Sequence, residues 1–174
     1  MGHIVAIVGG KGGVGKSVFA ANLAIAFSQL GAATVLVDAD LRTPRLHSLF
    51  RLPAGPGLSG LLSGRSEADL LRPVAGLPAL RVLPVGTVPP NPLELVQRPV
   101  FRLLMRELCA KFDHVVVDTP AASHGADARV IAAQCGAAVV LGRRRATRMQ
   151  SLQALLQALG KSGAQVAGVM VNEY

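Results

Sequence analysis

The sequence predicts an α/β fold in which helices cover both faces of a mostly parallel central sheet. Short Val-rich runs alternate with stretches of helical character through most of the chain, as a parallel sheet with crossover helices requires. The residues are 51% hydrophobic but only 3% aromatic, so the core must be built from Val, Leu, Ile and Ala. We expect the 174 residues to form one domain, residues 1–174, because this length can bury a substantial core.

Six segments have the composition of buried strands. Each is short, rich in Val and bounded by Gly, Pro or Asp. They are residues 3–9, 33–40, 80–86, 114–120, 136–142 and 165–172. Strands of this kind suit a sheet that is covered on both faces.

Four helices are expected between these strands, at about residues 16–30, 92–110, 124–134 and 147–161. The second has a start signal, with Asn91 at the cap, Pro92 at the first helical position and Glu94 as the capping-box acid. Its apolar residues recur at one-face spacing, at Val96, Val100, Leu103 and Leu104. The Thr-Pro pair at 43–44 repeats the start signal, and residues 52–71, rich in Gly, Ser and Pro, are expected to form short helical turns on the surface.

Composition excludes several classes of protein. The net charge is +8, but the arginines are scattered and no aromatic side chains are interleaved with them, so we expect no specific nucleic-acid partner. A functional basic surface stays open as the less favoured interpretation. The run at 143–145 is interpreted as a solvated loop, with contact to a phosphate or a partner as the alternative.

Cysteine usage and hydropathy indicate a cytoplasmic protein. Cys109 and Cys135 have neither pairing nor metal-site spacing, so we expect two reduced, buried side chains. No apolar run approaches the roughly 18 residues of a membrane span, and no signal peptide precedes the first strand.

The segment GKGGVGKS at 10–17 matches the phosphate loop G-x-x-x-x-G-K-S, and it lies between a strand and a helix as that motif requires. Glycines allow successive backbone N–H groups to face an anion, and the helix N-terminus adds its dipole. Lys16 would reach the outer phosphates of ATP, and the Ser17 hydroxyl would ligate Mg²⁺. The candidate nucleotide-binding residues here are Gly10, Lys11, Gly12, Gly13, Val14, Gly15, Lys16, Ser17 and Val18.

Three acids close predicted strands. Asp38 and Asp40 follow the second strand and Asp118 ends VVVD, so the carboxyl edge of a parallel sheet would bring them together above the phosphate loop. Mg²⁺ needs only one or two carboxylates because it keeps several waters. For Asp40, pairing with Arg42 or a backbone amide is an alternative. Asn172, at the end of the last strand, is a candidate for contacting a base edge or a turn residue.

The motifs GKGGVGKS, VLVDAD and VVVDTP resemble the deviant-Walker-A branch of P-loop ATPases. That branch contains plasmid-partition and division-site-placement ATPases as well as bacterial tyrosine kinases. Segments 37–64 and 83–121, including PPNPLEL, are similar to the bacterial tyrosine kinases of exopolysaccharide export. The resemblance covers nearly the whole chain and is nearest to separate cytoplasmic kinases that accompany a chain-length-determinant membrane protein, the EpsG type.

The resemblance implies an ATP- and Mg²⁺-dependent protein-tyrosine kinase (an autokinase) regulating exopolysaccharide chain length and export. It implies a homo-oligomer, a dimer or a ring, held at the inner membrane by the cytoplasmic segment of its partner. Lys16 would act on the phosphates, Ser17 and Asp118 would hold Mg²⁺, and Asp38 and Asp40 would supply a metal ligand and a base for the tyrosine hydroxyl. Phosphoryl transfer would then depend on positioning and charge neutralisation.

Lys11 keeps a second function open. An extra lysine at this position is typical of the partition and division ATPases, in which it crosses a dimer to the partner's phosphates. The alternative is therefore a dimerising ATPase switch, with Lys11 in a catalytic role. The family's helix before the first strand and its tyrosine-rich tail are not found, and Tyr174 is the only tyrosine. Asn172 is similar to the adenine-contacting Asn of the wider superfamily.

Overall fold

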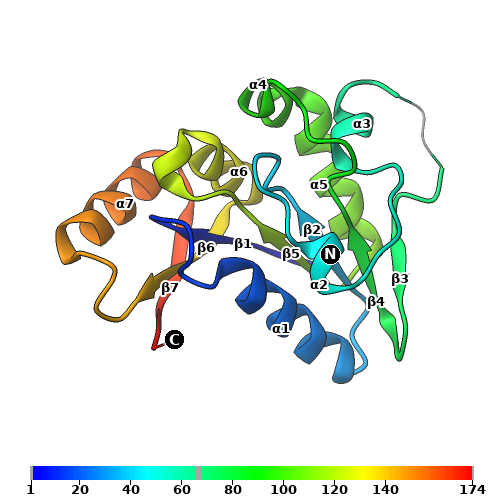
Figure 1. Cartoon of the computed structure of the whole chain (residues 1–174), viewed down its shortest axis with the longest axis horizontal. Helices are drawn as coiled ribbons and strands as arrows, with labels where there is room; N and C mark the ends of the chain where they lie inside the picture. The colour runs from blue at the N-terminus through cyan, green and yellow to red at the C-terminus, as the bar shows by residue number, and fades with distance from the viewer. Residues whose placement is uncertain (1, 66–67, 174) are drawn as a thin grey trace.

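A seven-stranded sheet forms the centre of the molecule in the computed structural model, which describes residues 2–65 and 68–173 (Figure 1). The strand order is β3-β4-β2-β5-β1-β6-β7, and every neighbouring pair is parallel except β3 and β4. The strands are β1 His3–Gly9, β2 Thr34–Asp38, β3 Arg72–Val74, β4 Leu77–Leu83, β5 His114–Asp118, β6 Ala137–Arg143 and β7 Gln165–Asn172. The predicted α/β class and all six predicted strands are confirmed.

The helices cover both faces of the sheet, as predicted. They are α1 Lys16–Gln29, α2 Leu46–Leu49, α3 Leu58–Leu62, α4 Pro92–Gln97, α5 Pro99–Lys111, α6 Asp127–Cys135 and α7 Met149–Lys161, with the 3₁₀ turn η1 Ala122–His124. α1 packs on one face, and α4 to α7 lie on the other (Figure 1). The two cores are mainly aliphatic, with β-strand residues such as Ile7 and Val117 fully buried. No helix of the described residues combines the length and the apolarity needed to cross a lipid bilayer.

The prediction of one helix over 92–110 was wrong. Arg98 has an extended conformation, with φ −63° and ψ 144°, so α4 ends and α5 begins at Pro99. A proline disfavours helical geometry in the residue before it, which explains the break. The break also changes the buried face of the second half, because Phe101 and Met105 are buried there while Leu103 is 57% exposed.

Of the two predicted helix starts, the first is confirmed in position and the second was wrong. Helix α4 begins at Pro92, with Asn91 as the N-cap residue and Glu94 in the first turn. The Asn91 side chain donates to the Glu94 carboxylate and makes no capping bond to the backbone. Thr43 starts no helix, because its hydroxyl donates to Asp40, and α2 begins only at Leu46. Strand β3 was missed because it is short and contains a proline, which is tolerated at the edge of a sheet.

The topology gathers the predicted functional residues at one edge. β1 lies between β5 and β6 in the sheet. The strand order therefore runs outward from β1 in both directions, with β5, β2 and β4 on one side of it and β6 and β7 on the other. The carboxyl ends of β1, β2, β5, β6 and β7 share an edge because these strands are parallel. Ligands of open α/β sheets bind at such a switch point.

Candidate functional site

The loop between β1 and α1 has the geometry of an anion cradle. Gly15 stands at the N-cap of α1 with φ 92°, and a Cβ there would lie 2.6 Å from Nδ2 of Asn172, so only glycine fits. A Cβ added at Gly10, Gly12 or Gly13 would meet nothing within 4 Å. The loop is thus open on the side where a phosphate would approach the helix N-terminus.

Asp38 and Asp118 lie next to each other at the ends of neighbouring strands. They are register partners in the β2–β5 pair, and both are 0% exposed. Lys16, 7% exposed, is the nearby cation. Burial lowers the pKa of Lys16, and the charges of Asp118 and Asp40 act in the opposite direction. The three acids predicted at the strand ends are therefore brought together with the phosphate-loop lysine.

The Asp118 carboxylate is buried, and neither of its oxygens accepts a hydrogen bond of good geometry among the described residues; the Ser17 hydroxyl and the Thr119 N–H are the donors near enough to lower its pKa. Burial raises the pKa of Asp118 to about 6, while the Ser17 hydroxyl and the Lys16 charge oppose that rise. Buried polar groups are almost always hydrogen-bonded, so an unsatisfied carboxylate points to a ligand. A cation at this position would supply the missing interaction.

Asp38 is engaged differently. Its two oxygens accept backbone N–H groups of Leu46, at 3.1 Å, and of Asp40, at 3.3 Å. Burial, followed by the charge of Asp118, raises the pKa of Asp38 to about 8. Asp38 thus ties the segment after β2 to the start of α2.

Asp40 faces the cavity and orders the same segment. Its carboxylate accepts the Thr43 N–H at 2.9 Å, the Thr43 hydroxyl at 3.0 Å and the Arg42 N–H at 3.2 Å. Of the two alternatives for Asp40, bonding to a backbone amide is therefore the one that the structure shows. The Arg42 guanidinium instead binds Asp127 on α6, with Nε 2.6 Å from Oδ2.

Two adjoining cavities flank the loop. One, of about 220 Å³, is lined by Gly12, Gly13, Gly15, Lys16, Ser17, Val18, Asp40, Thr43, Arg45, Ala121 and His124. The other, of about 380 Å³, is lined by Gly15, Val18, Phe19, Asn22, Leu141, Met170, Val171 and Asn172. They share Gly15 and Val18, so they form one site with a polar end and a more apolar end. Asn172 lies at the apolar end, and its Nδ2 donates to the Val14 carbonyl at 3.3 Å.

The donor set fits magnesium. No group of three or more His, Cys, Asp or Glu side chains among the described residues is placed to hold a metal by itself. Mg²⁺ is usually bound through one or two carboxylates, waters and substrate phosphates. Asp118 with the Ser17 hydroxyl would provide the protein's share of such a site, whereas both oxygens of Asp38 already accept backbone N–H groups.

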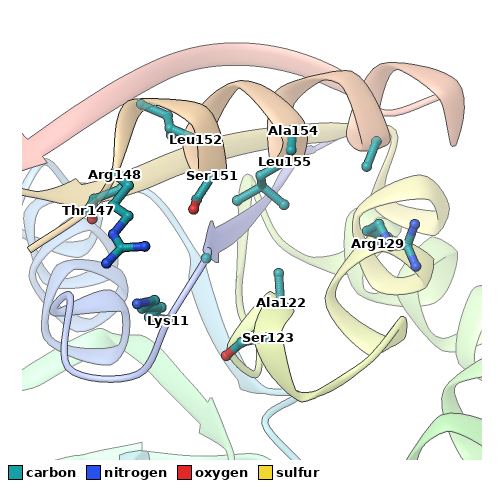
Figure 2. Close-up of a pocket in the computed structure, with 12 residues that line it drawn as sticks. Lys11, Ala122, Ser123, Arg129, Thr147, Arg148, Ser151, Leu152, Ala154 and Leu155 are labelled. Carbon is teal, nitrogen blue, oxygen red and sulfur yellow. The ribbon is translucent and has the colours of Figure 1, made fainter.

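Lys11 does not line the cavity that contains Lys16. Its side chain is exposed and lies on the other side of the loop, in a groove that also contains Arg148 (Figure 2). The nearby arginine run is partly engaged, because Arg143 donates to the Gly13 carbonyl at 3.4 Å and Arg144 pairs with Glu173 at 2.8 Å. All three arginines are exposed, as the predicted solvated loop requires, and the alternative of contact with a phosphate or a partner stays a prediction.

Sequence reasoning missed several residues that support the site. The Ser123 N–H donates to the Gly10 carbonyl at 2.9 Å, and the Thr119 hydroxyl donates to the Ile7 carbonyl at 2.7 Å. The bond between Asp40 and Thr43 could have been predicted, because Asp side chains commonly accept hydrogen bonds from residues two or three positions later in turns. The Arg42–Asp127 pair, 85 residues apart, had no local signal.

Comparisons with known proteins agree with this geometry. Residues 1–172 match the ParA family, described as NUBPL iron-transfer P-loop NTPase. The tyrosine-protein kinase ptk of Acinetobacter johnsonii is 33% identical over 98% of this chain, which spans only 23% of that protein. The putative tyrosine-protein kinase CapB of Staphylococcus aureus is 31% identical, with 94% of this chain and 72% of the relative aligned.

Solved structures give the same picture. The kinase domain of the Escherichia coli tyrosine kinase ETK superposes with a TM-score of 0.92 at 30% identity, covering 98% of this chain and 67% of that domain. The cell division ATPase MinD of Pyrococcus furiosus has a TM-score of 0.85 at 26% identity, covering 100% of this chain and 73% of MinD. MinD therefore represents a related fold, and the kinase domain is the more similar of the two.

Proposed function

The chain belongs to the ParA family of P-loop NTPases and, within it, to the bacterial tyrosine-protein kinases, and from this premise we propose that it is an ATP- and Mg²⁺-dependent protein-tyrosine kinase. Residues 1–174 would act as one ATP-binding domain that regulates exopolysaccharide chain length and export. The observation that carries the proposal is the buried Asp118 carboxylate, unsatisfied beside Lys16 and Ser17. A purely structural nucleotide-binding module would leave this carboxylate without a role.

Each side chain has a distinct proposed task. The loop N–H groups and the Lys16 ammonium hold the phosphates of ATP. Ser17 and Asp118 would hold Mg²⁺, which when bound neutralises charge on the phosphates. Asn172 closes the more apolar cavity, where the base would lie.

Between the two acids after β2, Asp40 is better placed than Asp38 to accept the proton of a tyrosine hydroxyl. Asp40 lines the polar cavity and is 6% exposed, whereas Asp38 is fully buried and its oxygens accept backbone N–H groups. We assign Asp38 the task of holding the segment from Asp40 to Leu46 in place. The Arg42–Asp127 pair anchors that segment to α6.

We also propose a partner and a location. We assign the chain to the type that works with the cytoplasmic segment of a chain-length-determinant membrane protein, on the strength of the segments 37–64 and 83–121. It would act in the cytoplasm at the inner membrane, as a dimer or a ring, without a specific nucleic-acid partner.

The test is incubation with γ-labelled ATP and Mg²⁺, with and without that cytoplasmic segment. Label on tyrosine is expected, and Lys16→Ala should abolish it. Because Tyr174 is the only tyrosine of the chain, Tyr174→Phe separates autophosphorylation from transfer to the partner; Tyr174 itself lies outside the described residues. Phosphate release without labelled tyrosine in either protein would contradict the kinase proposal.

Lys11 supports the alternative of a dimerising ATPase switch. Its side chain is exposed and is not part of the lining of its own phosphate cavity, as expected of a residue serving a second copy. That function predicts ATP-dependent dimerisation that Lys11→Ala abolishes, measured by light scattering with ATP and Mg²⁺. An unchanged mass with ATP would remove this alternative.

A further inference from the structure

We propose that a groove beside the phosphate loop docks an acidic peptide segment carrying an apolar side chain, the flank of the tyrosine that the kinase phosphorylates. The inference rests on the proposed function and adds a substrate class to it. The groove has a volume of about 390 Å³, within the range of about 300–1,000 Å³ of small-ligand sites. It lies between the loop after β1, the turn η1 and helix α7 (Figure 2).

The floor of the groove is apolar. Leu155 points into it from α7 (Figure 2), and Leu152 and small side chains of the same helix and of η1 also line it. The lining consists of Gly10, Lys11, Ala122, Ser123, Arg129, Thr147, Arg148, Ser151, Leu152, Ala154, Leu155 and Ala158. Such a floor suits one or two aliphatic or aromatic side chains, which gain free energy by leaving water.

The rim is cationic. Lys11 and Arg148 lie at one end of the groove and Arg129 at the other, and all three side chains are exposed (Figure 2). None of the three forms an ion pair within the described part of the chain, and the described lining contains no Asp or Glu. Helix α7 also directs its N-terminus, without an acid in its first turn, toward this end. Charge complementarity therefore selects an acidic occupant.

The same charges disfavour a second copy of the chain. In a two-fold symmetric contact the same surface patch faces itself. A dimer centred on this groove would bring two cationic rims together, and the described lining offers no acid to offset them. An acidic peptide meets no such repulsion.

The position of the groove links docking to phosphoryl transfer. The groove and the phosphate cavity are lined by neighbouring residues of the same two segments, the loop at 10–13 and the turn at 121–124. The Ser123 N–H bond to the Gly10 carbonyl joins these two segments. A segment bound in the groove is thus held one loop away from the nucleotide, so a tyrosine a few residues along can enter the phosphate cavity.

The test measures binding without ATP, by fluorescence anisotropy with three labelled peptides. The first contains a Leu and a Tyr among glutamates; in the second, glutamines replace the glutamates; in the third, Ser replaces the Leu. We expect the first to bind, and the other two to bind at least about tenfold more weakly. Equal binding of the glutamine peptide would overturn the proposal.

Two variants locate the binding. Arg148→Glu reverses a rim charge and Ser151→Glu adds an acid to an exposed lining position, so each should weaken the first peptide's binding about tenfold or more. Arg106→Glu, an exposed arginine on α5 away from the groove, makes the same charge change as Arg148→Glu and should bind like the wild type. Equal loss in Arg106→Glu would show only the effect of net charge and would refute the groove.

Further outcomes separate this inference from its premise. Peptide binding that depends on the groove, without transfer of label to tyrosine, contradicts the kinase proposal and the substrate role of the peptide, while the groove stands as a site for acidic peptides. Label transfer with peptide binding that is insensitive to Arg148→Glu and Ser151→Glu contradicts the groove alone. A dimer in light scattering that Ser151→Glu dissociates would assign the groove to a second copy and overturn the peptide proposal.

Discussion

Replacing Asp118 by Asn should stabilise the nucleotide-free protein while impairing its function. The carboxylate is buried without a hydrogen-bond partner among the described residues, and burial raises its pKa from 3.8 to about 6. At about 1.4 kcal/mol per pKa unit, ionised Asp118 costs the folded state about 3 kcal/mol above pH 6. Asn has the same shape and no charge, so Asp118→Asn should gain up to about 3 kcal/mol; the pKa of about 6 already includes the opposing attraction of Lys16.

The pH dependence gives the sign of the effect. A group with a raised folded-state pKa binds its proton more tightly in the folded protein, so its contribution to stability is complete below about pH 4 and is lost as the pH rises through about 6. The advantage of Asp118→Asn should therefore be present near pH 8 and absent near pH 4.

Urea denaturation of both proteins in EDTA, near pH 4 and near pH 8, measures the difference. Mg²⁺-dependent ATP turnover of Asp118→Asn should fall strongly in parallel. A variant less stable than the wild type near pH 8, or a gain that does not change with pH, would refute the reasoning. Unchanged Mg²⁺ titration of turnover would refute the metal role of Asp118.

Four further changes test neighbouring parts of the structure. Lys16→Ala should weaken ATP binding in calorimetry by about 10- to 100-fold, the value of a charge-assisted bond, whereas exposed Lys161→Ala should bind normally. Arg42→Ala leaves Asp127 buried without its partner and should lower the free energy of unfolding by about 1–3 kcal/mol, discounted because Arg42 is a third exposed. Arg144→Ala, which breaks the exposed pair with Glu173, should change stability little. Asp38, with its pKa raised to about 8, should make the metal-free protein less stable as the pH rises from about 4 to 8, and Asp38→Asn should flatten that slope in thermal melts.

Local patterns predicted the strands and the phosphate loop because both depend on short-range chemistry. Val-rich runs bounded by Gly or Asp can be recognised without knowing their neighbours, and the loop's glycines are required by its backbone. The clustering of Asp38 and Asp118 was predictable too, since parallel strands end at one edge. Their direct register partnership strengthens that prediction.

The wrong helix predictions arose where one residue overrides the local pattern of its neighbours. Between residues 92 and 110 the apolar spacing favoured one helix, but Pro99 rotates the second half so that Leu103 faces solvent. After β2, the Thr-Pro pair is a typical helix-start signal, but the Thr43 hydroxyl donates to the Asp40 carboxylate and does not cap a helix. The partner of Arg42 is 85 residues away and can be found only in the folded protein.

The arrangement of charges explains why Mg²⁺ would enter together with ATP. With its pKa at about 8, Asp38 is largely protonated near neutral pH. It therefore adds little negative charge beside Asp118. Lys16, Asp40 and Asp118 then leave a formal charge of minus one in a largely buried site. Bare triphosphate would meet that excess negative charge beside Lys16, whereas a divalent cation reverses its sign and satisfies the free Asp118 oxygens. The carboxylate that destabilises the site without a cation is therefore the group that would make nucleotide binding depend on magnesium.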